Sequence, residues 1–217
     1  MLIGVFVTLM GCGAPLETPP PNAMTPPQVA PTLPGRYVAE DAFEKLSFPD
    51  NRPVFREGAD WLIAHPTDAL PLLIAGLDPE EPEFQGVLRV LPLVPGREGA
   101  EALGKTYETS DDVIVLAVAN ALAKHPDPAA LSALRRGANS PRRPQRDAAL
   151  IALGARGDST VCPEILGAIP DPDENTRFYA VRSGIQLGCL DEELRTQLAS
   201  DPSQQVRDLL EASAVTP

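Results

Sequence analysis

The side chains best suited to chemistry are few: the 217 residues include two histidines and three cysteines. His65 and His125 each precede a proline and lie 60 residues apart, which predicts turn residues at helix ends rather than a catalytic pair. The sequence has no His-Glu pair and no His-Glu-x-x-His, Cys-x-x-Cys or Gly-x-Ser-x-Gly motif. We therefore expect a protein that is not an enzyme and that uses neither a metal ion nor another cofactor.

The three cysteines fall into two groups. Cys12 directly follows Gly11 and the uncharged apolar run of residues 2–10, which is too short for a bilayer span of about 20 residues and fits the core of a secretory signal peptide. Cys162 and Cys189 lie near the turns of adjacent helical units. An exported protein meets an oxidising compartment, so these two cysteines would form a disulfide there. The alternative is two free thiols that pack as small core residues.

A cluster of arginines stands out from an otherwise acidic chain. Its members are Arg135, Arg136, Arg142, Arg143 and Arg146, in a sequence with 18 basic residues, 30 acidic residues and a formal net charge of −12. The overall charge repels phosphate backbones, so we expect no nucleic-acid partner. In one interpretation Arg135 and Arg136 offset the negative end of a helix. In the sharper hypothesis, Arg135, Arg136, Arg142 and Arg143 form a basic rim that docks an acidic protein, a polyanionic glycan or lipid headgroups.

A period of about 30 residues organises the elements that carry these side chains. The two segments `WLIAHPTDALPLLIAGL` from Trp61 and `ALAKHPDPAALSALRRG` from Ala121 lie two periods apart. Each unit reads as a helical hairpin, which cannot bury its apolar stripe alone and must stack on its neighbours. With 43% hydrophobic but only 5% aromatic residues, the core must consist of Leu, Ala, Val and Ile. We expect an all-α fold, an α-solenoid of about five hairpins and a terminal helix.

The helical pattern divides the folded part into an N-terminal cap, residues 36–53, and a repeat domain, residues 54–217. The cap contains a short helix over Tyr37–Leu46, and in the third hairpin Asp127 is the expected N-cap. The helices of the repeat domain are expected at Val54–Ala64 and Asp68–Leu77, Glu83–Leu93 and Glu98–Tyr107, Asp112–Lys124 and Pro128–Arg136, Arg143–Leu153 and Thr160–Ile169, Asp173–Leu187 and Glu192–Ala199, and Ser203–Ser213.

Three units carry a family resemblance. The segment `RDAALIALG` from Arg146, preceded by Pro141, is similar to the first-helix signature of HEAT repeats of the PBS-lyase type. The same pattern recurs at Asp171-Pro172 with Thr176-Arg177 and at Asp201-Pro202 with Val206-Arg207. The resemblance covers roughly Val54 to Ala214. It implies that Arg146, Arg177 and Arg207 bond to neighbouring repeats and are structural residues.

A second resemblance concerns the N-terminus. The tetrapeptide Leu9-Met10-Gly11-Cys12 resembles the bacterial lipobox, whose cysteine is diacylated and becomes the new N-terminus. This implies a signal peptide over residues 1–11 and lipid attachment at Cys12. Residues 12–35 then form a proline-rich flexible tether, with eight prolines between Ala14 and Gly35. Gly13 stands where an aspartate would resemble an inner-membrane retention signal, which favours the outer membrane, on its periplasmic or surface face.

These observations predict a non-catalytic, lipid-anchored scaffold that binds a protein partner in the bacterial cell envelope. Its membrane contact would be the N-terminal lipid, and its partner surface the concave one formed by second helices. Those helices include Asp68–Leu77, Pro128–Arg136 and Thr160–Ile169. One alternative is an accessory protein of PBS-lyase-like type that binds a small ligand, although one Trp and three Tyr offer little to line a chromophore pocket. Another is a structural envelope protein that self-associates.

Overall fold

The computed structural model describes residues 35–214, with side chains from Val38 onward. The expected signal peptide, Cys12 and the tether before Gly35 lie outside the described residues. Between Gly35 and Ala214 the chain forms twelve α-helices and three short 3-10 helices, and this range contains no strand. The predicted all-α fold is confirmed.

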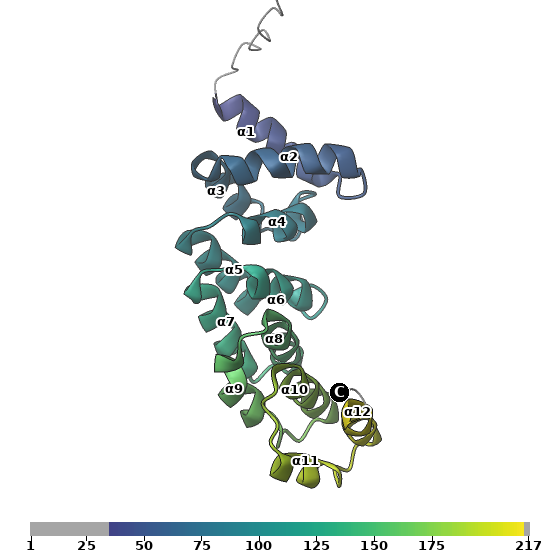
Figure 1. The fold of residues 1–217 in the computed structure, drawn as a ribbon. Helices are drawn as coiled ribbons and strands as arrows, with labels where there is room; N and C mark the ends of the chain where they lie inside the picture. Colours follow the sequence, from purple (N-terminus) through teal and green to yellow (C-terminus); the bar gives the residue numbers. More distant parts are fainter. Residues whose placement is uncertain (1–34, 215–217) are drawn as a thin grey trace, which may run out of the picture. The chain divides into compact units, whose positions relative to one another are not determined.

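An N-terminal helix precedes five hairpins and a last single helix (Figure 1). The cap consists of α1 (Gly35–Glu44) and η1 (Lys45–Ser47). The hairpins are α2 (Arg52–Ala64) with α3 (Pro66–Ala75), α4 (Phe84–Val90) and η2 (Leu91–Leu93) with α5 (Arg97–Thr109), α6 (Val115–Lys124) with α7 (Pro128–Ala138), α8 (Arg143–Arg156) with η3 (Ser159–Val161) and α9 (Cys162–Gly167), and α10 (Glu174–Leu187) with α11 (Glu192–Leu198). The last helix is α12 (Gln204–Ala214).

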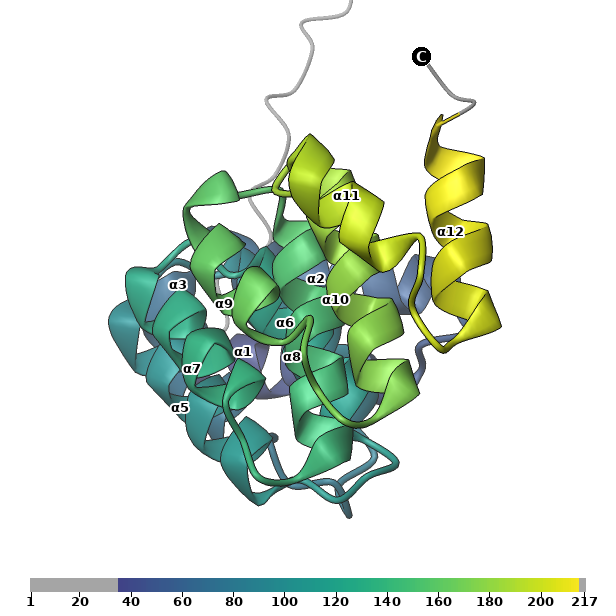
Figure 2. The same cartoon turned by 90° about the horizontal axis from the view of Figure 1, so that it is seen from below.

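The helices form two layers. The first helices of successive hairpins contact one another in the order α2, α4, α6, α8, α10, α12, and the second helices α3, α5, α7 and α9 do the same. Figure 2 shows these layers side by side, with α5, α7 and α9 in one and α6, α8 and α10 in the other. Each hairpin therefore buries its apolar stripe against its neighbours, as expected for a solenoid.

Local sequence sets the helix boundaries. The Asp127 side chain accepts a hydrogen bond from the Ala129 backbone N–H at 2.8 Å, which confirms the predicted N-cap. Gly157 and Gly188 end α8 and α10 with φ of 75° and 70°, a conformation that glycine adopts without strain. The second hairpin differs from the prediction, because α4 ends at Val90 and passes into the 3-10 helix η2. Pro92 lies within η2 and lacks the N–H that a longer α-helix would need.

The core is continuous and depends on small residues where helices meet. Leu73, Leu103, Leu134 and Leu153 are fully buried along the array. One such close approach lies between α8 and α10, where a Cβ on Gly154 would lie 2.5 Å from the Ser183 hydroxyl. None of the helices between Gly35 and Ala214 is both long and apolar enough to cross a membrane.

Candidate partner-binding site

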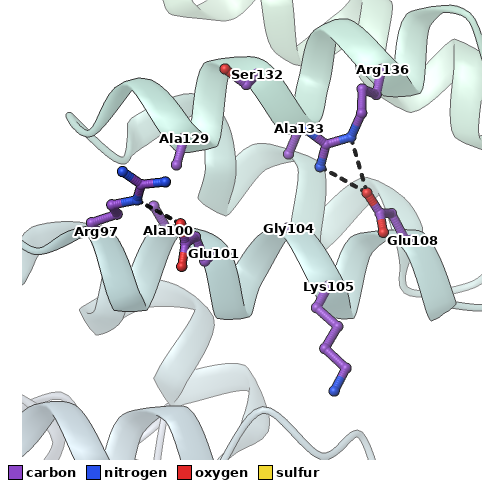
Figure 3. Close-up of a pocket in the computed structure, with 10 residues that line it drawn as sticks. All are labelled: Arg97, Ala100, Glu101, Gly104, Lys105, Glu108, Ala129, Ser132, Ala133 and Arg136. Atoms are coloured by element: carbon purple, nitrogen blue, oxygen red, sulfur yellow. Dashed lines mark hydrogen bonds and ion pairs between the residues drawn. The ribbon is translucent and has the colours of Figure 1, made fainter.

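The second-helix layer contains a groove between α5 and α7 (Figure 3). Its volume is about 340 Å³. Small side chains allow the two helices to approach each other: Ala100 and Ala133 are buried, and a Cβ on Gly104 would lie 3.2 Å from that of Ala133. The remaining lining residues are Arg97, Glu101, Lys105, Glu108, Ala129, Ser132 and Arg136.

Charged side chains border the groove in pairs. Arg97 donates to Glu101 at 2.6 Å within α5, and this hydrogen bond raises the pKa of the guanidinium. Arg136 of α7 binds Glu108 of α5 at 2.8 Å and so joins the two helices at the other end. Lys105 extends away from α7 (Figure 3). The groove presents a mostly polar surface, suited to hydrogen bonds with a peptide segment. No histidine or cysteine lines it.

Each arginine of the predicted basic rim contacts a neighbouring hairpin. Arg135 donates to the Thr160 carbonyl at 3.0 Å and pairs with Glu164 at 3.3 Å, and Arg136 binds Glu108.

Arg142 donates to the Ser110 carbonyl at 2.9 Å and to Asp112 at 2.8 Å, and Arg143 pairs with Asp173 at 3.4 Å. A partner would therefore have to share or displace these contacts. Of the four, Arg136 lines the α5–α7 groove.

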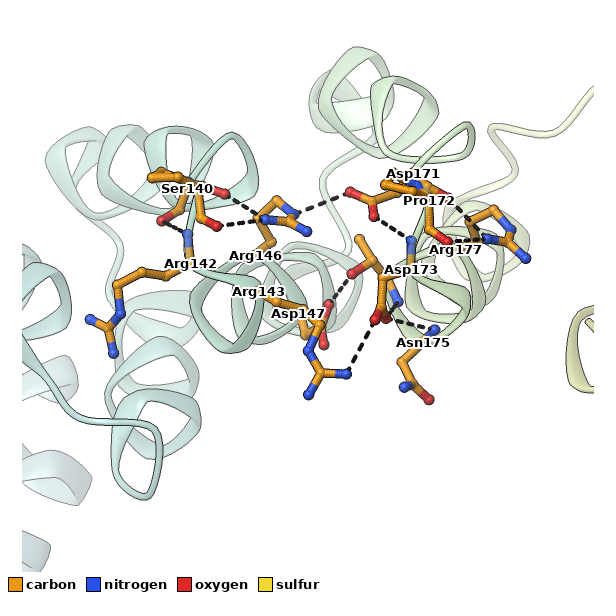
Figure 4. A network of polar contacts seen from close by, with 12 residues as sticks. Ser140, Arg142, Arg143, Arg146, Asp147, Asp171, Pro172, Asp173, Asn175 and Arg177 are labelled. Carbon is orange, nitrogen blue, oxygen red and sulfur yellow. Dashed lines mark hydrogen bonds and ion pairs between the residues drawn. The ribbon is translucent and has the colours of Figure 1, made fainter.

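Arg146, Arg177 and Arg207, here called the arginine ladder, occupy equivalent positions in the last three first helices. Arg146 donates to the carbonyls of Ser140 and Pro141 at 2.9 and 3.1 Å and pairs with Asp171 of the next unit at 3.2 Å (Figure 4).

Arg177 repeats this arrangement, with the Asp171 carbonyl at 2.9 Å and the Asp201 carboxylate at 3.1 Å. Arg207 binds the Asp201 carbonyl and Gln204. Arg146 and Arg177 thus bond to the next unit, as the resemblance implies, whereas these contacts of Arg207 lie within its own unit.

The two histidines end equivalent first helices but differ in environment. His65 is exposed and stacks on Trp61 with ring centroids 4.1 Å apart. His125 is fully buried. Its Nδ1 accepts the Asp127 backbone N–H at 3.2 Å, whereas its Nε2 has no hydrogen-bond partner. Burial lowers the pKa of His125; Asp127 opposes this effect, and Arg156 adds to it. Both residues occupy turns, as predicted.

Cys162 and Cys189 are joined by a disulfide, with Cα atoms 5.5 Å apart. The bond connects the start of α9 to the turn after α10 and so links the fourth and fifth hairpins. Within residues 35–214, no group of three or more His, Cys, Asp or Glu side chains could hold a metal ion.

Sequence reasoning missed a buried polar cluster that joins the second, third and fourth hairpins. Tyr107 donates its hydroxyl to the Gln145 carbonyl at 2.5 Å, and the Gln145 amide donates to the Tyr107 carbonyl at 3.2 Å. Burial raises the pKa of the Tyr107 hydroxyl, which keeps it a hydrogen-bond donor. The Gln145 side chain also accepts from Ser140 at 2.6 Å. No periodic signal marks these residues, because a single tyrosine and a single glutamine make the contact.

The fold and the groove define the chain as an all-α protein of stacked helical hairpins. Residues 70–154 match the family model described as HEAT repeats, and the chain is accordingly HEAT-like. The match begins within α3 and ends within α8, so it includes the second hairpin, where two prolines interrupt the pattern.

Two solved structures are similar to the chain. The complex of CpcE and CpcF of phycocyanin lyase from Nostoc sp. PCC7120 aligns at 22% identity and a TM-score of 0.44, over 89% of this chain and 80% of that chain. An engineered protein aligns at 15% identity and a TM-score of 0.47, over 82% of this chain and 87% of that chain. No curated protein matches the sequence.

Proposed function

We propose that this HEAT-like protein is a non-catalytic scaffold, anchored by a lipid on Cys12 to a bacterial membrane, that holds a protein partner in the cell envelope. The observation that carries the scaffold role is the polar groove between α5 and α7. The lipid anchor rests on the resemblance of residues 9–12 to the lipobox and on the proline-rich segment that follows.

The groove suits recognition because the helices on either side of it are fixed. The Arg136–Glu108 pair joins α5 to α7, and the Tyr107–Gln145 hydrogen bonds join α5 to α8. A pre-organised surface loses little conformational entropy when a partner binds. Among the exposed groove side chains, Arg136 can donate hydrogen bonds to a partner. Glu101 and Glu108 can accept them, and so can Ser132, whose hydroxyl donates to the Pro128 carbonyl at 3.0 Å. The expected partner segment is therefore polar rather than apolar.

Affinity capture with the full chain, expressed in a bacterium that carries its gene, tests this proposal. Ser132→Trp places a bulky side chain in the groove and should reduce recovery of the partner at least about tenfold. Gln197→Trp, which introduces the same bulky side chain at an exposed position of α11, serves as the control and should leave recovery unchanged. Equal recovery with both variants would remove the groove from the proposal.

The basic rim is tested in the same capture experiment. Arg142→Ala combined with Arg143→Ala removes two cations but leaves the groove lining intact. A loss of partner with this variant and not with Ser132→Trp would move the contact to the turn between α7 and α8. A protein that captures only its own copies with every bait would indicate self-association instead.

A further inference from the structure

The C-terminal end of the array contains a second groove of different chemistry, between α11 and α12. Figure 2 shows where these two helices lie. Its volume is about 560 Å³, and its surface is mostly apolar. The apolar lining includes Ala199, Leu210 and Ala214. This groove shares no residue with the one between α5 and α7, so an inference about it is independent of the proposed function.

The position of this groove follows from the repeat. Helices α5, α7, α9 and α11 each contact the first helix that comes next in the chain, and α5, α7 and α9 also contact the preceding second helix. Within residues 35–214, no second helix follows α12. The groove lies beside the last turns of α12, where such a helix would pack against α11. The groove therefore presents a mostly apolar surface at the place where a second helix would lie.

The charges around the groove select the kind of helix. Glu192 and Glu211 are exposed members of its lining. Arg195, the basic member, donates to the Leu190 carbonyl at 3.4 Å and to the hydroxyl of Ser213, another lining residue, at 3.2 Å, so its guanidinium is held between α11 and α12. An apolar surface between carboxylates is complementary to a helix with an apolar stripe and basic residues along its sides.

We propose that the α11–α12 groove binds a basic amphipathic helix of a partner protein, which completes the last hairpin by occupying the place of a second helix. The apolar stripe lies against Ala199, Leu210 and Ala214, and the basic side chains pair with Glu192 and Glu211. Most of the affinity comes from the apolar contact, and the exposed carboxylates contribute mainly to orientation and association rate.

A synthetic peptide tests this binding directly. The probe is a fluorescein-labelled helical peptide of about 18 residues with leucines on one face and lysines on the other, titrated with the full chain by fluorescence anisotropy. Ala199→Arg adds bulk and positive charge inside the groove and should weaken binding at least about tenfold. The matched control is Ala75→Arg, which makes the same change at the exposed last residue of α3 and should bind like the wild type.

Hydrogen exchange with the same peptide should protect α11 and α12 specifically. A peptide with glutamates in place of the lysines should bind more weakly than the leucine–lysine peptide. Equal weakening by Ala199→Arg and Ala75→Arg would overturn the proposal, because it would show general attraction to an acidic chain. Failure of the wild type to bind at about 1 mM peptide would also overturn it.

Discussion

Arg177 and Asp201 form a two-point ion pair across the boundary between the fifth hairpin and α12. The Arg177 Nε and Nη2 atoms each donate to one carboxylate oxygen at 3.1 Å. The two side chains are only 12% and 7% exposed. Partial burial would raise the pKa of Asp201, but the hydrogen bonds from Arg177 and the Ser203 N–H lower it. The hydrogen bonds to Asp201 raise the pKa of Arg177. The pair fixes the turn that begins the last unit.

Removal of this pair should destabilise the array. Arg177→Ala leaves the Asp201 carboxylate poorly compensated in a largely buried position and should lower the free energy of unfolding by about 3 kcal/mol. Arg97→Ala, which removes an exposed pair within α5, should cost less than about 0.5 kcal/mol. Urea titrations followed by circular dichroism measure both values. Similar small losses in the two variants would show that the buried pair adds no more than an exposed one.

His125 should make the free energy of unfolding depend on pH in the mildly acidic range. Its native pKa is lowered, so below the unfolded-state pKa of about 6.5 the unfolded chain takes up a proton that the native chain does not. Stability then falls as the pH drops from about 6.5 to the native pKa, by at most about 1.4 kcal/mol per pH unit. Protonation of Nδ1 would also place two donors face to face, since Nδ1 accepts the Asp127 N–H.

The measurement is the free energy of unfolding between about pH 7.5 and pH 5. His125→Asn keeps an acceptor near the Nδ1 position and should reduce the slope below pH 6.5, whatever it does to the stability at neutral pH. His65→Asn changes the exposed histidine and should leave the slope as it is. An unchanged slope in His125→Asn would assign the acid sensitivity to other groups.

The disulfide should stabilise the fourth and fifth hairpins. Cys162 and Cys189 are 27 residues apart in the sequence, and a loop of this length confines the unfolded chain enough to contribute about 3 kcal/mol. Cys162→Ser with Cys189→Ser should lower the free energy of unfolding by that amount, and a reductant should do the same to the wild type. Two titratable thiols in the native, unreduced protein would contradict the bond.

The lipid anchor predicts a specific modification of Cys12. A bacterium supplied with an alkyne-labelled fatty acid should incorporate the label into the full chain, and the protein should sediment with membranes. Cys12→Ala should abolish both the label and the sedimentation, because it removes the acylated thiol. Cys162→Ala provides the matched control and should retain the label. Label in Cys12→Ala would place the lipid elsewhere in the chain.

The repeat period made most helices predictable, since a 30-residue spacing and apolar periodicity mark both helices of a hairpin. The contacts between hairpins were harder to predict, because they depend on how far each helix is rotated about its own axis. Arg142 and Arg143 illustrate this point: they were interpreted as a basic rim, yet each contacts a carboxylate 30 residues away. Opposite charges at one repeat period are thus a usable signal for pairing.

The α5–α7 groove was predictable only in outline. The second-helix layer was expected to carry the partner surface, but the sequence did not indicate which helix pair leaves a groove. That depends on Gly104 facing Ala133, and small residues also lie at other helix contacts, for example Gly154. Arg156 was also missed: it donates to the carbonyls of Leu122, Ala123 and His125 at the end of α6. This contact spans hairpins and has no local motif.

The fourth and fifth hairpins are joined at both ends of their long first helices. Arg146 and Asp171 connect them at the start of α8 and α10, and the disulfide connects them at the opposite end. If the chain is pulled from its two termini, the residues between Cys162 and Cys189, which include α10, carry no tension until a covalent bond breaks, because the disulfide bridges them. Under tension the array therefore extends on either side of this disulfide-closed loop, which acts as a fixed-length link between two extensible segments.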